Sequence, residues 1–311
     1  MIHVACASDD AYAPHAAALI HSLAEVHAKR GVQVYYLHDQ TLTGPIREIL
    51  QHYCASLNIG LRFIEVRSGG ETGNLPACTL IPELAWYRTL LPDLLPELDR
   101  VLYLDTDIIV QAPLSEFFDM DLGNCYAACV NDYLAAIAHP EVAKNIDVPY
   151  ERYFNSGVML LNLKALRDAG GGQRILEIAK KNVTHLHFPD QDALNLALGE
   201  NTKLVSPRWN YPALSLQYFK KYSGNSALTL PACEEVRRKG FLPVIIHYSA
   251  HPKPWRTFNP YEYFAPYHYH RAHTPWPRNA SDIKKLRLRT LIPMSIVRMI
   301  QKLKSYFSAD A

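Results

Sequence analysis

The stretch VLYLDTDIIV, residues 101–110, places two aspartates within a run of apolar and β-branched residues. Such a run predicts a buried strand, and burying an unpaired carboxylate is costly. Side chains two residues apart in a strand project to the same face, so Asp105 and Asp107 should lie side by side, with Thr106 facing away. Because adjacent carboxylates repel and hard divalent cations bind carboxylate oxygens, the pair indicates a metal site. A turn with two solvated aspartates is the alternative that this motif leaves open.

The composition is typical of a soluble globular protein, with 49% hydrophobic and 20% charged residues among 311. This length is sufficient for one large α/β domain or two small ones. The chain lacks a run of eighteen apolar residues that could span a membrane. It opens with MIHVACASDD, which resembles a strand and lacks the basic start of a signal peptide. We therefore expect a cytoplasmic protein.

Strand-like and helix-like segments alternate through the first half of the chain. Strands are predicted at residues 2–7, 32–38, 61–66 and 101–110, and helices at residues 15–28, 45–53 and 82–91. This alternation predicts a mostly parallel sheet with helices on both faces. Ligands of such sheets bind beyond the carboxyl ends of the strands, where Asp9 and the aspartate pair would lie. The sequence contains neither a GxGxxG motif nor a Walker loop, so phosphates must be held in another way, for example by a metal ion.

Three later segments add polar residues to this edge of the sheet. A strand is predicted at residues 153–163, a helix at residues 189–198 with Asp190 near its positive end, and a short buried strand that ends at His247. A lone histidine at a strand end is usually structural. Beside a carboxylate pair, His247 becomes a candidate third metal ligand.

The C-terminal part differs in character from the rest. From about residue 266 an aromatic, His- and Pro-rich linker leads into a tail with seven positive charges between residues 284 and 304. Apolar residues recur at helical spacing through residues 283–307, so we expect an amphipathic segment bound to the inner face of an anionic membrane. A basic helix packed on the body, or one that is simply solvated, is the alternative. The predicted division is a catalytic domain, 1–265, and a linker with a basic helical tail, 266–311.

Four ordered motifs carry a resemblance to a known family. VLYLDTDIIV, FNSGVMLLNL, PDQDALN and HYSAHPKPW follow one another in an order and spacing that resemble glycosyltransferase family 8, over roughly residues 1–260. Within that family the chain is most similar to bacterial lipopolysaccharide and lipooligosaccharide galactosyl- and glucosyltransferases. The resemblance implies a GT-A fold with a Rossmann-like, mostly parallel central sheet. It also implies a UDP-galactose or UDP-glucose donor, a Mn²⁺ ion and retention of anomeric configuration.

The family pattern assigns the metal and the diphosphate to four residues. By resemblance, Asp105, Asp107 and His247 bind the metal, which bridges the two phosphates of UDP. Lys253, in the KPW segment, adds a positive charge at the diphosphate. A ligand set of two oxygens and one nitrogen suits Mn²⁺ better than Mg²⁺, which prefers oxygen ligands.

The same pattern assigns contacts with the nucleoside and the sugars. Asp9 and Tyr12 would hold uridine, with Tyr12 stacked on the uracil. Asp132 would help to bind donor or acceptor. The contacts with the donor sugar fall on Arg88, Asn155, Asp190 and Gln191.

Gln191 and Asp190 are the candidate catalytic residues. Retention by double displacement requires a carboxylate beneath the anomeric carbon. The matching position is Gln191, whose amide is a weak nucleophile, with Asp190 beside it. We therefore favour a front-face mechanism, in which the acceptor hydroxyl attacks on the side from which UDP leaves.

Two other readings of the sequence remain. An aspartyl-phosphate phosphatase also carries a D-x-D motif at a strand end, but usually near its first strand. A sugar-nucleotide-binding protein with weak catalysis is the second, favoured only by Ala11 and Ala250, where the family often has Asn and Gly. The expected partners are a UDP-hexose donor, a saccharide or glycolipid acceptor and a membrane surface, but no nucleic acid.

Overall fold

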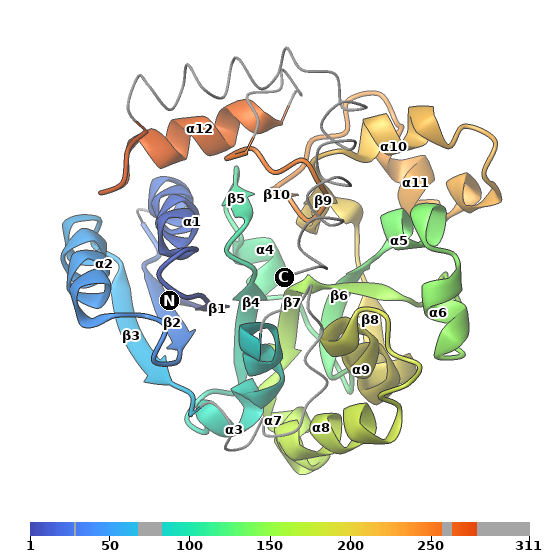
Figure 1. Cartoon of the computed structure of the whole chain (residues 1–311), viewed down its shortest axis with the longest axis horizontal. Coiled ribbons are helices and arrows are strands. Elements are labelled where there is room, and N and C mark those ends of the chain that lie inside the picture. Colours follow the sequence, from blue (N-terminus) through green and yellow to red (C-terminus); the bar gives the residue numbers. More distant parts are fainter. Residues whose placement is uncertain (28, 68–82, 257–262, 279–311) are drawn as a thin grey trace, which may run out of the picture.

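A seven-stranded sheet forms the centre of the molecule, with the strand order β3-β2-β1-β4-β7-β6-β8 (Figure 1). The computed structural model describes residues 1–27, 29–67, 83–256 and 263–278. The strands of this sheet are β1 (Ile2–Ala7), β2 (Val32–His38), β3 (Gly60–Glu65), β4 (Arg100–Leu104), β6 (Ala127–Asn131), β7 (Phe154–Asn162) and β8 (Thr202–Leu204).

Strand β7 alone in this sheet runs antiparallel to its neighbours β4 and β6, and the remaining described pairings are parallel. The mostly parallel sheet predicted from the sequence is therefore confirmed. A smaller sheet has the order β5-β10-β9, formed by Ile108–Val110, Ile245–His247 and Tyr211–Pro212. Because β7 is reversed, its first residues lie at the same edge of the large sheet as the carboxyl end of β4.

Helices cover both faces of the large sheet. On one face α1 (Ala13–Val26), α2 (Gly44–Ser56) and α4 (Ser115–Phe118) pack against strand residues such as Val4 and Cys6. On the other face the 3₁₀ helix η1 (Glu83–Leu90), α3 (Leu91–Leu94), α7 (Leu163–Asp168), α8 (Gly171–Lys181) and α9 (Pro189–Leu198) pack against residues such as Ala5 and Tyr103. Alternate residues of a strand thus pack into cores on opposite faces of the sheet, because successive side chains of a strand point to opposite faces.

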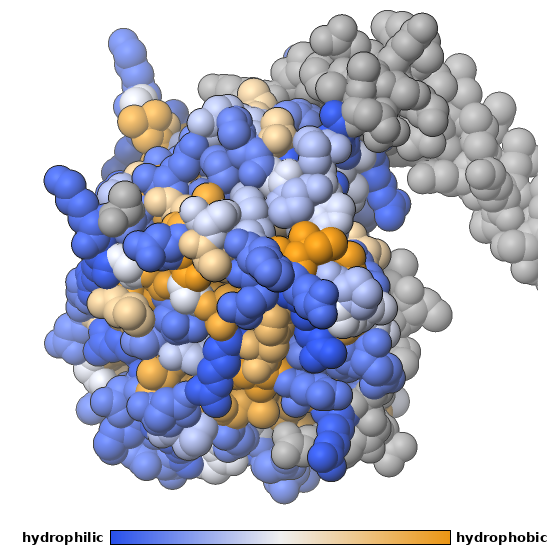
Figure 2. All heavy atoms as spheres, turned by 90° about the vertical axis from the view of Figure 1, so that its left-hand side faces the viewer, coloured by the Kyte–Doolittle hydropathy of each residue, from blue (hydrophilic) through white to orange (hydrophobic). Residues whose placement is uncertain are grey.

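The described residues form eight further helices, none longer than nine residues. These are α5 (Tyr133–Ala138), α6 (Glu141–Asn145), η2 (Gly199–Asn201), η3 (Pro207–Trp209), α10 (Ser215–Lys221), η4 (Ser226–Thr229), α11 (Pro231–Val236) and α12 (Phe264–Ala272). Figure 2 shows the side of the molecule that carries α2, where hydrophilic side chains cover most of the surface and apolar atoms appear between them.

The single strand predicted for residues 101–110 is wrong. β4 ends at Leu104 in the large sheet, and β5 begins at Ile108 in the small one. The aspartates therefore lie at the carboxyl end of β4, as expected, but in a three-residue connection between two sheets rather than in one continuous strand. A strand ladder would have buried both carboxylates in the core, whereas the connection leaves them half-buried at its edge.

The linker predicted from residue 266 is also wrong at its start. Residues 264–272 form α12, whose Phe264 and Tyr267 share a buried cluster with Ala18 of α1. The predicted boundary at residue 265 falls inside this helix. The basic segment 283–307 lies outside the described residues, so its helical, membrane-binding character stays a prediction. Within the described part of the chain, no helix has both the length and the apolar character needed to cross a membrane.

Candidate active site

The candidate site lies where the two sheets meet. Asp105 follows the last residue of β4, and Asp107 precedes the first residue of β5. Strand β10 pairs antiparallel with β5 and sets His247 opposite Ile108, next to Asp107. The reversed strand β7 brings its Gly157 to Asp105, whose backbone N–H donates to the Gly157 carbonyl at 2.8 Å. Sheet pairing thus gathers residues that are far apart in the sequence.

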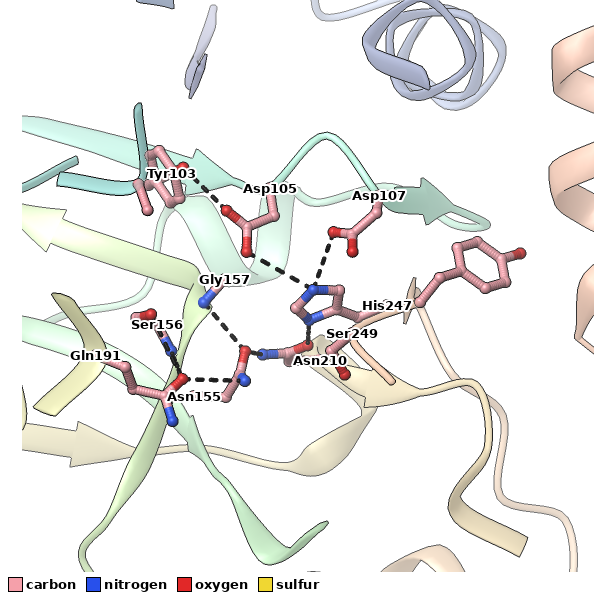
Figure 3. Close-up of polar contacts among 12 residues, drawn as sticks. Tyr103, Asp105, Asp107, Asn155, Ser156, Gly157, Gln191, Asn210, His247 and Ser249 are labelled. Atoms are coloured by element: carbon pink, nitrogen blue, oxygen red, sulfur yellow. Dashed lines mark hydrogen bonds and ion pairs between the residues drawn. The ribbon is translucent and has the colours of Figure 1, made fainter. Parts of the chain in front are cut away.

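Asp105, Asp107 and His247 point toward one another (Figure 3). The Nε2 atom of His247 lies 3.1 Å from Oδ1 of Asp107 and 3.7 Å from Oδ2 of Asp105. Two carboxylates and one imidazole in this arrangement could hold a divalent metal ion. The structure therefore brings together the three predicted metal ligands.

Asn210 fixes which nitrogen of His247 faces the carboxylates. Its Oδ1 lies 2.9 Å from the Nδ1 of His247, and its Nδ2 donates to Oδ1 of Asn155 at 2.9 Å. An amide oxygen can only accept, so Nδ1 carries the proton and Nε2 is left as the ligand atom. Two carboxylate oxygens and a lone pair on Nε2 repel unless a cation or a proton lies between them. The donor set therefore fits a metal ion, with Asn210 as the residue that orients the ligand.

Arg88 and Lys253 hold the remaining carboxylate oxygens. Arg88 lies 2.9 Å from Oδ1 of Asp105, an atom that also accepts from the Tyr103 hydroxyl at 2.9 Å. Lys253 donates to Oδ2 of Asp107 at 2.6 Å. Burial alone would raise the pKa of Asp107, but the ion pair with Lys253 holds it well below its ordinary value. Each aspartate thus offers one oxygen to a fixed cation and the other to the space beside His247.

Gly157 is required by the closeness of these groups. A Cβ atom at this position would lie 2.4 Å from Cε1 of His247 and 2.6 Å from Oδ2 of Asp105. Both distances are too short for real Cβ contacts, so any larger residue would displace His247 or Asp105, both candidate metal ligands. Gly157 therefore contributes to the site by leaving space for the side chains of His247 and Asp105.

The side-chain amide of Gln191 is held by four partners. Its Nε2 donates to Oδ2 of Asp132 at 3.0 Å and to the Tyr153 hydroxyl oxygen at 2.9 Å. Its Oε1 accepts from the Ser156 N–H at 3.0 Å and from Nδ2 of Asn155 at 3.2 Å. Both amide hydrogens and the amide oxygen are therefore engaged, which fixes the orientation of Gln191 at the start of α9.

Asp190, the neighbour of Gln191, is buried and faces Arg88. Its Oδ2 lies 3.5 Å from Nε of Arg88. Burial raises the pKa of Asp190 to about 6, even though Arg88 and nearby backbone N–H groups act to lower it. Arg88 is thus shared between a metal-ligand candidate and a carboxyl group that titrates nearer to neutrality than an ordinary aspartate.

A cavity of about 650 Å³ opens beside these groups. The predicted site residues that line it are Arg88, Asp105, Asp107, Asp132, Asn155, Asp190, Gln191, His247 and Lys253. Asp9 and Tyr12 are not among the described residues that line it. The carboxylate of Asp9 accepts from the Tyr12 N–H at 2.8 Å at the entry to α1, and the Tyr12 ring lies 5.9 Å from that of Trp255.

The sequence analysis did not identify Asn210 or Tyr103 as site residues, and it did not identify the steric role of Gly157. Asn210 follows the short helix η3 and has no fixed spacing to the other motifs. Tyr103 is an apolar strand position in the sequence, and its hydroxyl contact with Asp105 becomes visible only in three dimensions. Gly157 lies within one of the four motifs, in a predicted strand. A glycine inside a strand can indicate that another group approaches the backbone closely, and this signal could have identified its role.

A comparison with protein families shows to which family the chain belongs. The model of "Glycosyl transferase family 8" matches residues 3–258, which include all the residues that line the cavity. The chain belongs to glycosyl transferase family 8. It is a glycosyltransferase, and the match favours neither a phosphatase nor a binding protein with weak catalysis.

The individual relatives are distant in sequence. General stress protein A of Bacillus subtilis (strain 168) is 25% identical over 281 residues, which are 89% of this chain and 95% of that protein. Lipopolysaccharide 1,2-glucosyltransferase of Escherichia coli (strain K12) is 27% identical over 205 residues, 62% of this chain and 56% of that protein. The chain thus matches little more than half of the second relative.

A solved structure supports the fold assignment. The crystal structure of galactosyltransferase LgtC in complex with donor and acceptor sugar analogues has a TM-score of 0.78 and 21% sequence identity. The similarity covers 92% of this chain and all of that one. The GT-A fold expected of family 8 is therefore confirmed.

The role of Asn210 can be tested without measuring turnover. Asn210→Leu removes the acceptor for the Nδ1 proton of His247, so the imidazole is free to rotate or change tautomer. We expect the affinity for Mn²⁺, measured by calorimetry in the presence of UDP, to fall about 10–100-fold. Asn210→Asp, which keeps an acceptor oxygen, should restore most of it.

Asn145→Leu, at an exposed position of α6, is the matched control and should bind Mn²⁺ like the unsubstituted protein. An unchanged affinity in correctly folded Asn210→Leu would show that this hydrogen bond does not orient His247.

Proposed function

We propose that this protein transfers a hexose, galactose or glucose, from a UDP-sugar to a saccharide acceptor with retention of anomeric configuration. The observation that carries the proposal is the convergence of Asp105, Asp107 and His247 beside a cavity large enough for a sugar nucleotide. Family membership and the activities named for relatives, lipopolysaccharide 1,2-glucosyltransferase and lipopolysaccharide 1,3-galactosyltransferase, agree with it.

The charges of the site suit a diphosphate leaving group. A bound divalent ion, for which we propose Mn²⁺, would offset the negative charge that develops on UDP. Lys253 is buried beside Asp107, so it supplies a fixed positive charge at the same place. Arg88 supplies a second fixed charge beside Asp105. Asp9 and Tyr12, at the entry to α1, are proposed to hold the uridine.

The hydrogen bonds of Gln191 support a positioning role. A nucleophile needs a free lone pair directed at the anomeric carbon, whereas Oε1 of Gln191 accepts from Ser156 and Asn155. Asp190 is buried against Arg88 and has a raised pKa, which lowers its availability as a carboxylate. We therefore propose a front-face reaction in which Gln191 and Asp132 orient the sugars.

A glycolipid is the proposed acceptor class. Relatives named for lipopolysaccharide synthesis support this choice, and so does the basic, apolar pattern of residues 283–307. Binding of that segment to an anionic membrane would bring the enzyme to a lipid-linked acceptor. The protein would then work at the inner face of the cytoplasmic membrane.

A donor screen tests the proposed function. Purified protein is incubated with UDP-galactose, UDP-glucose, UDP-N-acetylglucosamine or GDP-mannose, with Mn²⁺ or with a chelator, and released nucleotide is measured. We expect release from one of the two UDP-hexoses, dependent on Mn²⁺. Release from GDP-mannose alone, or release that the chelator does not affect, would contradict the proposal.

The Gln191 assignment makes a second prediction. If Gln191 has a positioning role, Gln191→Ala removes the amide that holds Asp132 and Asn155 but no reacting group, and should keep roughly 1–10% of kcat, a loss on the order of 2 kcal/mol. An obligatory nucleophile would leave essentially no activity. A glycosyl adduct on Gln191, detected by mass spectrometry after incubation with donor, would contradict the positioning role.

A further inference from the structure

Two buried histidines, His21 and His270, face each other between α1 and α12, and neither lines the cavity of the candidate active site. The buried positions of α12 are Phe264, Tyr267 and His270, at a spacing that normally presents apolar side chains. His21 likewise lies within the buried run of α1. The two helices lie side by side (Figure 1). Imidazoles at such an interface require polar partners, because an unsatisfied polar group is costly to bury.

These partners form a compact cluster. Nδ1 of His21 lies 2.9 Å from Nδ1 of His270. Oε1 of Glu25 lies 4.0 Å from Nδ1 of His21, and Oε2 of Glu25 lies 3.8 Å from Nδ1 of His270. His21 and Glu25 are four residues apart and thus share a face of α1. Tyr269 donates its hydroxyl to Oε1 of Glu25 at 2.8 Å, which helps to hold the carboxylate.

We propose that His21, Glu25 and His270 form a second metal site, which takes Zn²⁺ or a chemically similar divalent transition metal. Two histidines and one glutamate are an established set of zinc ligands. Nitrogens that bind a tetrahedral zinc ion lie roughly 3.3 Å apart, so the two Nδ1 atoms need to separate by only a few tenths of an ångström. Glu25 is exposed, so the remaining coordination position is open to water.

The protonation of the two rings is compatible with this role. Burial lowers the pKa of His21, and it lowers the pKa of His270 to about 4, so both imidazoles are neutral near pH 7. In the metal-free protein one Nδ1 donates to the other. That ring must move its proton to Nε2 before both Nδ1 atoms can bind the ion, with no net loss of protons.

A metal ion at this site would link α12 to α1, whose first turn follows Asp9 and Tyr12, the residues proposed to hold the uridine. α1 begins just after Tyr12, and its His15 stacks on Trp255 with ring centroids 3.9 Å apart. His15 also contacts the Tyr267 hydroxyl of α12 at 2.6 Å. A zinc ion at the other end of α1 would fix α12 and, through these rings, the segment that carries Lys253.

The test uses the full-length, untagged protein with Asp107→Ala, which removes the catalytic metal site from the count. After dialysis against Zn²⁺, this protein should retain one zinc ion per chain by atomic emission. A hundredfold excess of zinc over Kd should raise its Tm by roughly 5 °C. Adding His270→Ala, or Glu25→Gln at the exposed position, should weaken zinc binding at least tenfold.

His52→Ala, an exposed histidine of α2, is the matched control and should leave zinc binding unchanged. Circular dichroism of the metal-free variants separates loss of a ligand from loss of the fold, and Glu25→Gln keeps the acceptor for Tyr269. If the Asp107→Ala protein retains no zinc, or if Glu25→Gln and His270→Ala bind it equally well, the cluster only packs two helices and the proposal is wrong.

Discussion

Repulsion between the carboxylates of Asp105 and Asp107 is the constraint on which the rest of the site depends. Two half-buried negative charges at one sheet edge must be balanced, and Arg88 and Lys253 balance them from opposite sides. His247 then faces the two oxygens nearest to it. The fixed cations leave that side of the pair open, so a divalent ion can bind there without displacing either ion pair.

The fold supplies this arrangement through strand direction. Reversal of β7 brings Asn155, Ser156 and Gly157 to the carboxyl end of β4. The switch of the chain from the large sheet to β5 takes the aspartates out of the core, and pairing of β10 with β5 adds His247. A glycine at position 157 is the one residue that fits between the histidine and Asp105. The positions of the candidate metal ligands and the steric limits of the site thus follow from two strand pairings and one connection between the sheets.

Sequence reasoning anticipated what depends on local pattern and motif. The period of apolar residues predicted β1, β2 and the helices α1 and α2, and the four motifs supplied most of the predicted site residues that line the cavity. It failed where tertiary context decides. The apolar run 101–110 looks continuous although its halves enter different sheets, and α12 is aromatic and His-rich because it packs on α1. Asn210 could not be found, since its role rests on one contact across the fold.

Mn²⁺ binding in the presence of UDP tests the central claim most directly. Electron paramagnetic resonance of free Mn²⁺ gives the affinity without requiring turnover. The account predicts that Asp107→Asn weakens binding at least tenfold, about 1.4 kcal/mol or more, while the protein stays folded. Asp168→Asn, at an exposed aspartate of α7, should bind as the unsubstituted protein does. Equal Mn²⁺ affinity in Asp107→Asn and the unsubstituted protein would contradict the account.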